Sequence, residues 1–164
     1  MQEIEVKIFE IDKDSLISKL VAIGAELIFD WEIAADFYRN AAGKKIRLRK
    51  ANWQNIMTFK EKLSEDAKME NMEYEIVFDD YGNLCKTLEG IWFDKYWSSA
   101  KYRIWYKLWN TVFDFDKLEW IPWFVEIESD NHADVEEWVK FLWYRMDETN
   151  KMTERLVKEH YWVA

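Results

Sequence analysis

Charged and apolar residues alternate along several short segments of this chain, and the alternation limits what the chain can fold into. The first such segment is Glu3-Ile4-Glu5-Val6-Lys7. Neighbouring side chains of a β-strand point to opposite faces, so this segment has one charged and one apolar face. The pattern recurs in later segments whose charged pairs are Arg47 and Arg49, Lys60 and Lys62, Glu73 and Glu75, Lys101 and Arg103, and Glu126 and Glu128.

In the later segments the charges are sorted by sign, so that the charged pair of each segment is either acidic or basic. A flat sheet with one solvated face would also show alternation, but solvated faces usually mix the two signs. Carboxylates are the ligands that Mg²⁺ and Mn²⁺ prefer, and Arg and Lys bind phosphate oxygens. The sorting therefore favours a charged interior that binds a metal ion and a polyphosphate, with the solvated sheet as the alternative.

The order of the elements predicts an α+β fold with an antiparallel sheet. Strands are expected near residues 3–8, 35–39, 45–50, 56–63, 73–78, 101–108, 111–117 and 123–129, and the short turns between several of them suit hairpins. Helices are expected from Asp12 or Asp14 to Gly24, over 80–89 with Gly90 as the stop, over 133–142 and over 152–160. We expect one domain over residues 1–164, built as a closed antiparallel β-barrel, a tunnel, with the helices packed on its outside.

Composition excludes several classes of protein. The 23 basic and 32 acidic residues give a net charge of −9, which argues against a nucleic-acid partner. No apolar run approaches the roughly 18 residues of a membrane span, so we expect a cytoplasmic protein without a membrane partner. The lone Cys85 excludes an internal disulfide and a cysteine-based zinc site. Walker-type phosphate loops and nucleophile elbows are also absent from the sequence.

In sequence the chain resembles the CYTH family, the triphosphate tunnel metalloenzymes, which include class IV adenylate cyclases, thiamine triphosphatases and inorganic triphosphatases. The resemblance begins with a Glu-x-Glu-x-Lys strand, here Glu3, Glu5 and Lys7. It continues in the family's order through the segments KIRLRK, TFKEKL, MEYEI, KYRI, FDFDKLE and FVEIE, over nearly the whole chain.

The resemblance implies roles for particular residues. Divalent metal, Mg²⁺ or Mn²⁺, is expected on Glu3, Glu5, Glu73, Glu75, Asp116, Glu126 and Glu128. The triphosphate is expected on Lys7, Arg47, Arg49, Lys60 and Arg103, with Lys62 and Lys101 as additions. Lys7, Lys60, Arg103 and Lys151 are the expected catalytic residues.

The resemblance also implies a reaction, in which metal and basic groups neutralise charge during phosphoryl transfer. We expect a metal-dependent phosphohydrolase that acts on a small-molecule triphosphate, either inorganic or organic, as a monomer or a homodimer. Two alternatives stay open. One is a class IV adenylate cyclase that converts ATP to cyclic AMP and pyrophosphate, and the other is a non-catalytic module that binds polyphosphate or nucleotide.

Tryptophan is abundant and glycine scarce, with 11 and 4 residues respectively. Trp53, Trp109, Trp120 and Trp143 stand where a turn would normally use glycine, and by the resemblance Trp120 matches a glycine of the family. Three interpretations are open: the backbone there needs no positive φ, the sequence is engineered or altered at these positions, or the indoles stack on a base.

Overall fold

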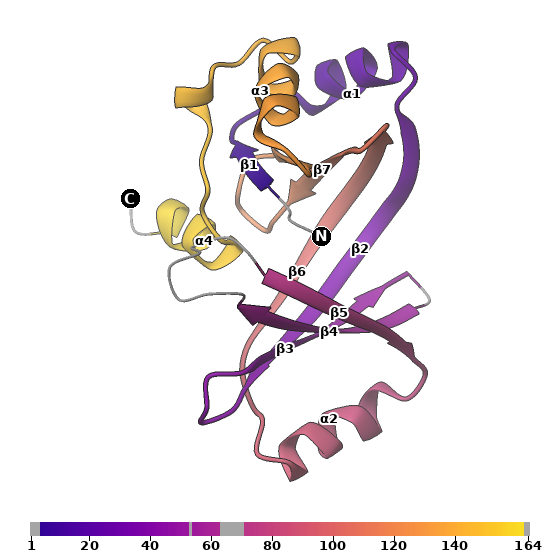
Figure 1. Ribbon diagram of the computed structural model, residues 1–164, viewed down its shortest axis with the longest axis vertical. Coiled ribbons are helices and arrows are strands. Elements are labelled where there is room, and N and C mark those ends of the chain that lie inside the picture. The colour runs from indigo at the N-terminus through magenta and orange to yellow at the C-terminus, as the bar shows by residue number, and fades with distance from the viewer. Residues whose placement is uncertain (1–3, 53, 63–70, 163–164) are drawn as a thin grey trace. The chain divides into compact units, whose positions relative to one another are not determined.

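The structure, a computed structural model, describes residues 4–52, 54–62 and 71–162 (Figure 1). The strands are β1 Ile4–Ile8, β2 Glu26–Arg39, β3 Lys45–Ala51, β4 Gln54–Lys62, β5 Asn71–Phe78, β6 Asp94–Leu108, β7 Thr111–Lys117 and β8 Phe124–Ser129. The helices are α1 Lys13–Ala22, α2 Tyr81–Gly90, α3 His132–Phe141 and α4 Glu154–Trp162, with a short 3₁₀ turn, η1, at Met146–Glu148.

The strands form one sheet in the order β1-β8-β7-β6-β2-β3-β4-β5. Every pair whose register the described residues define is antiparallel. Within those residues, no hydrogen-bonded pair joins the two ends of the order, β1 and β5. The α+β class and the antiparallel sheet are thus confirmed, whereas closure of the sheet into a barrel is not.

The chain divides into two compact units. One unit comprises Trp31–Lys101, and the other comprises Glu3–Asp30 together with Tyr102–Ala164. The long strands β2 and β6 each contribute residues to both units. A single domain over residues 1–164 stays a prediction.

In the unit formed by Glu3–Asp30 and Tyr102–Ala164, α1 and α3 pack on β1 and β6–β8 (Figure 1). Leu16 and Leu20 of α1 and Val139 of α3 belong to the same buried cluster as Phe113 and Phe115 of β7. Asp12 caps α1, because its carboxylate accepts a hydrogen bond from the amide of Ser15. Of the two candidate N-cap residues in the sequence, Asp12 and Asp14, the structure therefore selects Asp12.

In the unit formed by Trp31–Lys101, α2 packs on β2 and β3. Leu88 of α2 shares a buried cluster with Tyr38, Ile46 and Leu48, and Met57 and Phe59 of β4 pack against it. The apolar parity of these strands therefore faces the helix, as the alternation predicted. In both units the charged pairs of the alternating segments, such as Arg47 and Arg49 of β3 and Glu126 and Glu128 of β8, occupy the opposite parity to the core residues of the same strand.

Four tryptophans have left-handed backbone conformations, which cost an L-residue about 1–2 kcal/mol each. They are Trp92, Trp109, Trp120 and Trp143, with φ of 61°, 54°, 64° and 72°. Positive φ was in question at Trp109, Trp120 and Trp143, and it is present at all three; Trp53 lies outside the described residues. Helix α2 ends at Gly90, one residue beyond the predicted Glu89, and the left-handed residue that follows the helix is Trp92.

Candidate metal and phosphate site

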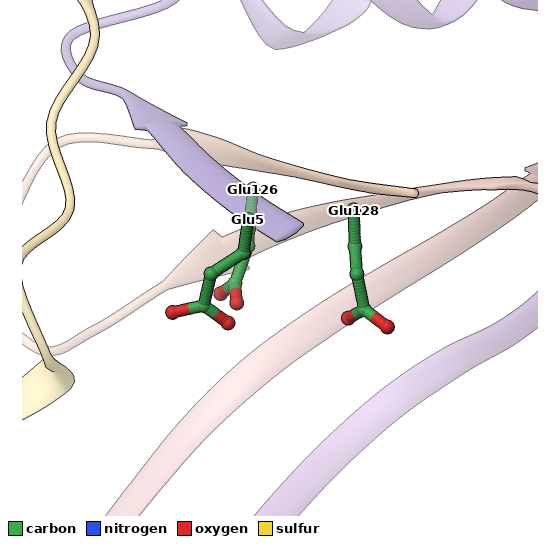
Figure 2. Close-up of side chains that lie close together, drawn as sticks. All are labelled: Glu5, Glu126 and Glu128. Carbon is green, nitrogen blue, oxygen red and sulfur yellow. The ribbon is translucent and has the colours of Figure 1, made fainter. Parts of the chain in front are cut away.

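Three glutamates meet on one face of the sheet where β1 pairs with β8. The register places Glu5 opposite Glu128 and Lys7 opposite Glu126. Residues two apart on a strand share a face, so Glu5, Glu126 and Glu128 extend to the same side of the sheet (Figure 2). One carboxylate oxygen from each lies within 4.8 Å of the others, and all three side chains are half-buried. This spacing suits a divalent cation with oxygen ligands.

Lys7 supplies positive charge to the same cluster. Its Nζ lies 3.1 Å from Glu5 Oε1 and 3.4 Å from Glu126 Oε2, and its side chain is only 5% exposed. The backbone of Lys7 also forms a two-way bridge with Asn150, whose amide and carbonyl exchange hydrogen bonds with it. The two side-chain contacts hold the ammonium group of Lys7 between the carboxylates of Glu5 and Glu126.

Protonation in this cluster depends on burial. Burial, followed by the hydrogen bond and charge of Glu126, raises the pKa of Glu5 to about 7, against a smaller opposite effect of Lys7. Burial alone would lower the pKa of Lys7, but the charges of Glu126 and Glu5 outweigh it and the pKa is raised. At neutral pH, Lys7 is therefore charged, while Glu5 is present in both its protonated and its ionised form.

Arg103 of β6 is enclosed by carboxylates from two other strands. Its Nε and Nη2 donate to the two oxygens of Asp116, at 2.6 and 2.7 Å, and its Nη1 contacts Asp114. Its Nη2 also lies 3.7 Å from Glu126 Oε2. Burial opposes the charge, but Asp114 and Asp116 raise the pKa of Arg103 above its ordinary value. The paired strands thus carry a continuous row of alternating charge from Arg103 to Lys7.

This acidic cluster contains five carboxylates, Glu5, Asp114, Asp116, Glu126 and Glu128, and two cations, Lys7 and Arg103. When Glu5 is ionised, the cluster has an excess of three negative charges, which favours the binding of a cation at this partly buried site. Asp116, predicted as a metal ligand, uses both oxygens on Arg103, whereas Glu5, Glu126 and Glu128 are the group whose spacing fits an ion.

A second set of predicted residues meets within the unit formed by Trp31–Lys101. Arg47 and Arg49 of β3 both reach Glu75 of β5, at 3.7 and 2.9 Å. Thr58 of β4, fully buried, accepts a hydrogen bond from Arg47 and donates one of 2.6 Å to Glu75. Glu75 was predicted as a metal ligand, and here it is the counter-ion of two arginines. We call these four residues the arginine cluster.

For several of the remaining predicted site residues, the structure describes only the backbone position or does not describe the residue. Glu3 lies outside the described residues. Lys60 and Lys62 on β4 and Glu73 on β5 have defined strand positions, with Lys60 opposite Glu73, but their side chains lie outside the described part of the chain. Two further residues are Lys101, half-buried on β6, and Lys151, exposed next to the Asn150 that bridges to Lys7.

Two polar residues of these clusters were not predicted, Asp114 and Thr58. Both could have been found by extending the parity argument, because Asp114 has the parity of Asp116 in the FDFD segment and Thr58 has the parity of Lys60. Their contacts with arginines depend on the pairing of β6 with β7 and of β3 with β4.

None of the helices that the structure describes is long and apolar enough to cross a membrane. No curated protein matched the sequence.

Solved structures share the fold. A protein of Pyrococcus horikoshii is 23% identical over 92% of this chain and 96% of its own, with a TM-score of 0.76. A conserved hypothetical protein of Pyrococcus furiosus is also 23% identical, over 94% and 99%, with a TM-score of 0.76. A proposed adenylate cyclase of Vibrio parahaemolyticus is 14% identical over 97% and 98%, with a TM-score of 0.79.

The family comparison agrees with the sequence motifs and with the clusters of charge. The CYTH domain matches residues 1–161, which is nearly the whole chain and includes every strand of the sheet. The chain belongs to the CYTH domain family.

Proposed function

We propose that this protein is a divalent-metal-dependent phosphohydrolase that acts on a triphosphate, with Mg²⁺ or Mn²⁺ as its metal. The main support is the group of Glu5, Glu126 and Glu128, whose carboxylate oxygens lie within 4.8 Å of one another on one sheet face. Hard divalent ions bind such oxygens and usually complete their shell with water and substrate phosphate. A bound ion would neutralise charge on the phosphate oxygens.

The protein's own groups would divide the work by charge. Glu5, Glu126 and Glu128 would hold the ion, and Glu3, Glu73, Glu75 and Asp116 are proposed to add negative charge. The proposed phosphate ligands are Lys7, Arg47, Arg49, Lys60, Lys62, Lys101 and Arg103, with Lys151 as a further catalytic cation. Arginine suits this role because its planar guanidinium binds phosphate through two hydrogen bonds. The proposal includes closure of the charged faces into a barrel.

The present contacts also show what substrate binding must change. Arg47 and Arg49 lie on Glu75, and Arg103 lies on Asp114 and Asp116. A phosphate oxygen that binds these guanidinium groups would replace or share carboxylate contacts. The carboxylates would keep the arginines ordered before the substrate arrives, which lowers the entropic cost of binding.

Two other functions have specific support. Class IV adenylate cyclase is favoured by the structural likeness to the proposed adenylate cyclases of Vibrio parahaemolyticus and Bacillus halodurans. There the ribose hydroxyl of ATP would replace water as the nucleophile. A non-catalytic polyphosphate module is favoured by the arginine cluster, whose two guanidinium groups share one carboxylate and could bind an anion without reaction.

One substrate panel separates these functions. Inorganic triphosphate, thiamine triphosphate and ATP are each incubated with the protein and with Mg²⁺ or Mn²⁺. Release of phosphate from at least one of them, lost with a chelator, is the expected result. Formation of cyclic AMP and pyrophosphate from ATP would instead establish the cyclase.

A matched pair of variants links turnover to the acidic cluster. The double variant Glu126→Gln, Glu128→Gln keeps shape but loses charge, so we expect turnover to fall at least about 100-fold, as for other charge-stabilising groups. Glu119→Gln, an exposed carboxylate in the loop between β7 and β8, is the control and should keep full activity. Tight triphosphate binding with no turnover on any substrate would favour the non-catalytic module.

A further inference from the structure

Helices α1, α2 and α3 end in the same hydrogen-bonded motif, but the left-handed residue that follows the helix is glycine in one of them and tryptophan in the other two. After α1, the amide of Gly24 donates to the carbonyl of Val21, and the amide of Ala25 donates to Leu20. This pair of bonds defines the Schellman motif, whose first residue past the cap is left-handed and is usually glycine. Gly24 has φ of 93°, and a side chain there would meet open space.

The same two bonds recur after α2 and α3. After α2, Trp92 donates to Glu89 and Phe93 donates to Leu88, at 3.1 and 2.9 Å. After α3, Trp143 donates to Lys140 and Tyr144 donates to Val139, at 2.9 and 3.0 Å. Tryptophan thus occupies, in two helices, the position that glycine occupies in α1.

In two loops, tryptophan again occupies a position that normally needs glycine, but the turns are of other types. Leu108 pairs with Thr111, so Trp109 and Asn110 form a two-residue hairpin loop, and the positive φ of Trp109 matches the first position of a type II′ turn. The amide of Ile121 donates to Leu118, so Trp120, with φ of 64°, is the third residue of a four-residue turn. That is the position at which a type II turn needs glycine.

The four side chains are also unlike the tryptophans of the core. Trp92, Trp109, Trp120 and Trp143 are 76–83% exposed, whereas Trp138 is 9% exposed and packs edge-on against Phe113 at 5.2 Å. Trp109 lies 5.8 Å from the ring of Trp138, and Lys19 lies over Trp143 at 3.2 Å. These contacts involve mostly exposed indoles and do not require positive φ.

We infer that positions 92, 109, 120 and 143 are glycine positions, and that the organism carrying this gene makes the protein with glycine at all four. The low count of 4 glycines against 11 tryptophans agrees, because glycine averages about 7% of residues. A one-base difference separates the glycine codon GGA from UGA, a codon that some genetic codes read as tryptophan and others as glycine. The exposed indoles are then no docking surface.

The physical part of the inference is tested by thermal unfolding of the chain as written and of single variants. Replacing each of the four tryptophans by glycine should raise the Tm, and the four changes together should raise it further. A matched alanine variant at each position removes the indole but keeps a Cβ, so it should melt below the glycine variant. As reverse controls, Gly24→Trp and Trp138→Gly should each lower the Tm.

An alanine variant that melts as high as its glycine counterpart, or glycine variants that lower the Tm, would overturn the assignment of these positions. Peptide mass spectrometry of the protein purified from its own organism tests the rest and does not depend on folding of any variant. Peptides that cover positions 92, 109, 120 and 143 should contain glycine. Tryptophan in those peptides would show that the natural protein carries the strained indoles.

Discussion

Burial of charge is the main feature of this protein at the scale of single residues. Lys7 is 5% exposed, yet it stays charged because Glu5 and Glu126 lie within 3.4 Å of its ammonium group. Burial and the neighbouring Glu126 both raise the pKa of Glu5 and so favour its protonated, neutral form. A single proton on Glu5 therefore controls how much negative charge a metal ion would find here.

We predict that divalent-metal binding strengthens as pH rises through the Glu5 pKa of about 7. A metal ion binds the ionised carboxylate, so below this pKa it must displace a proton, whereas above it none is displaced. Between about pH 6 and about pH 8, Mn²⁺ affinity should rise about tenfold through this group. Calorimetric titration at the two pH values measures the change.

Glu5→Gln should bind Mn²⁺ more weakly and should lose most of the pH dependence, because it removes the titrating group. Glu119→Gln should retain both the affinity and the pH dependence of the original chain. Equal pH dependence in the Glu5→Gln variant would assign the proton to another group.

At the scale of elements, one carboxylate connects α2 to two strands. Asp36 of β2 accepts hydrogen bonds from Tyr81 of α2 at 2.9 Å and from Ser98 of β6 at 2.7 Å, and it pairs with Lys95 of β6 at 2.8 Å. Burial acts to raise its pKa, but Lys95, Ser98 and Tyr81 together lower it. Asp36 thus holds the start of α2 by polar contacts while Leu88 anchors its end in the core.

We predict that Asp36→Asn destabilises the protein by about 1–2 kcal/mol at neutral pH, because it weakens hydrogen bonds to a charged acceptor at a half-buried site. The folded pKa of Asp36 is depressed, so its stabilisation is present above the ordinary pKa of Asp and is lost as pH falls through the folded value. The difference between the two proteins in urea unfolding should therefore shrink in acid. Asp94→Asn, at an exposed position, is the control. A constant difference across pH would exclude this role for the Asp36 charge.

At the scale of the whole molecule, each unit carries its own charged cluster. The acidic cluster lies in the unit formed by Glu3–Asp30 and Tyr102–Ala164, and the arginine cluster lies in the unit formed by Trp31–Lys101. The acidic cluster has more carboxylates than cations, whereas the arginine cluster has two arginines and one carboxylate, so the two clusters differ in the sign of their excess charge. A ligand that carries both phosphate and a divalent ion has groups that suit each cluster.

We predict that inorganic triphosphate together with Mg²⁺ or Mn²⁺ raises the Tm, because the ligand binds only the folded state. At 100 times the dissociation constant the stabilisation is about 2.7 kcal/mol, which corresponds to about 5–10 °C for a chain of this size. Enclosed charges are screened less than exposed ones, so the shift should survive moderate salt. Differential scanning fluorimetry measures it.

Glu5→Gln should reduce this shift strongly, while Glu119→Gln should leave it intact. A shift that disappears in moderate salt and ignores Glu5 would identify an open, solvated charged face. That was the competing interpretation of the alternating strands.

Residue order alone was enough to predict the strands with alternating charge, the four helices and the faces on which charges gather, because these depend on the local period of two or 3.6 residues. It was not enough for β2 and β6. They begin at Glu26 and Asp94, well before the predicted 35 and 101, in stretches where charged and apolar residues do not alternate cleanly.

Only the tertiary structure decided which charges meet. Register across β1 and β8 brings Glu5, Glu126 and Glu128 together, while register across β6 and β7 gives both oxygens of Asp116 to Arg103. The left-handed backbone at Trp92 likewise follows from how α2 ends and not from the residue type there. Local sequence sets the face of each side chain, but contacts between strands depend on a pairing that brings together residues far apart in the chain.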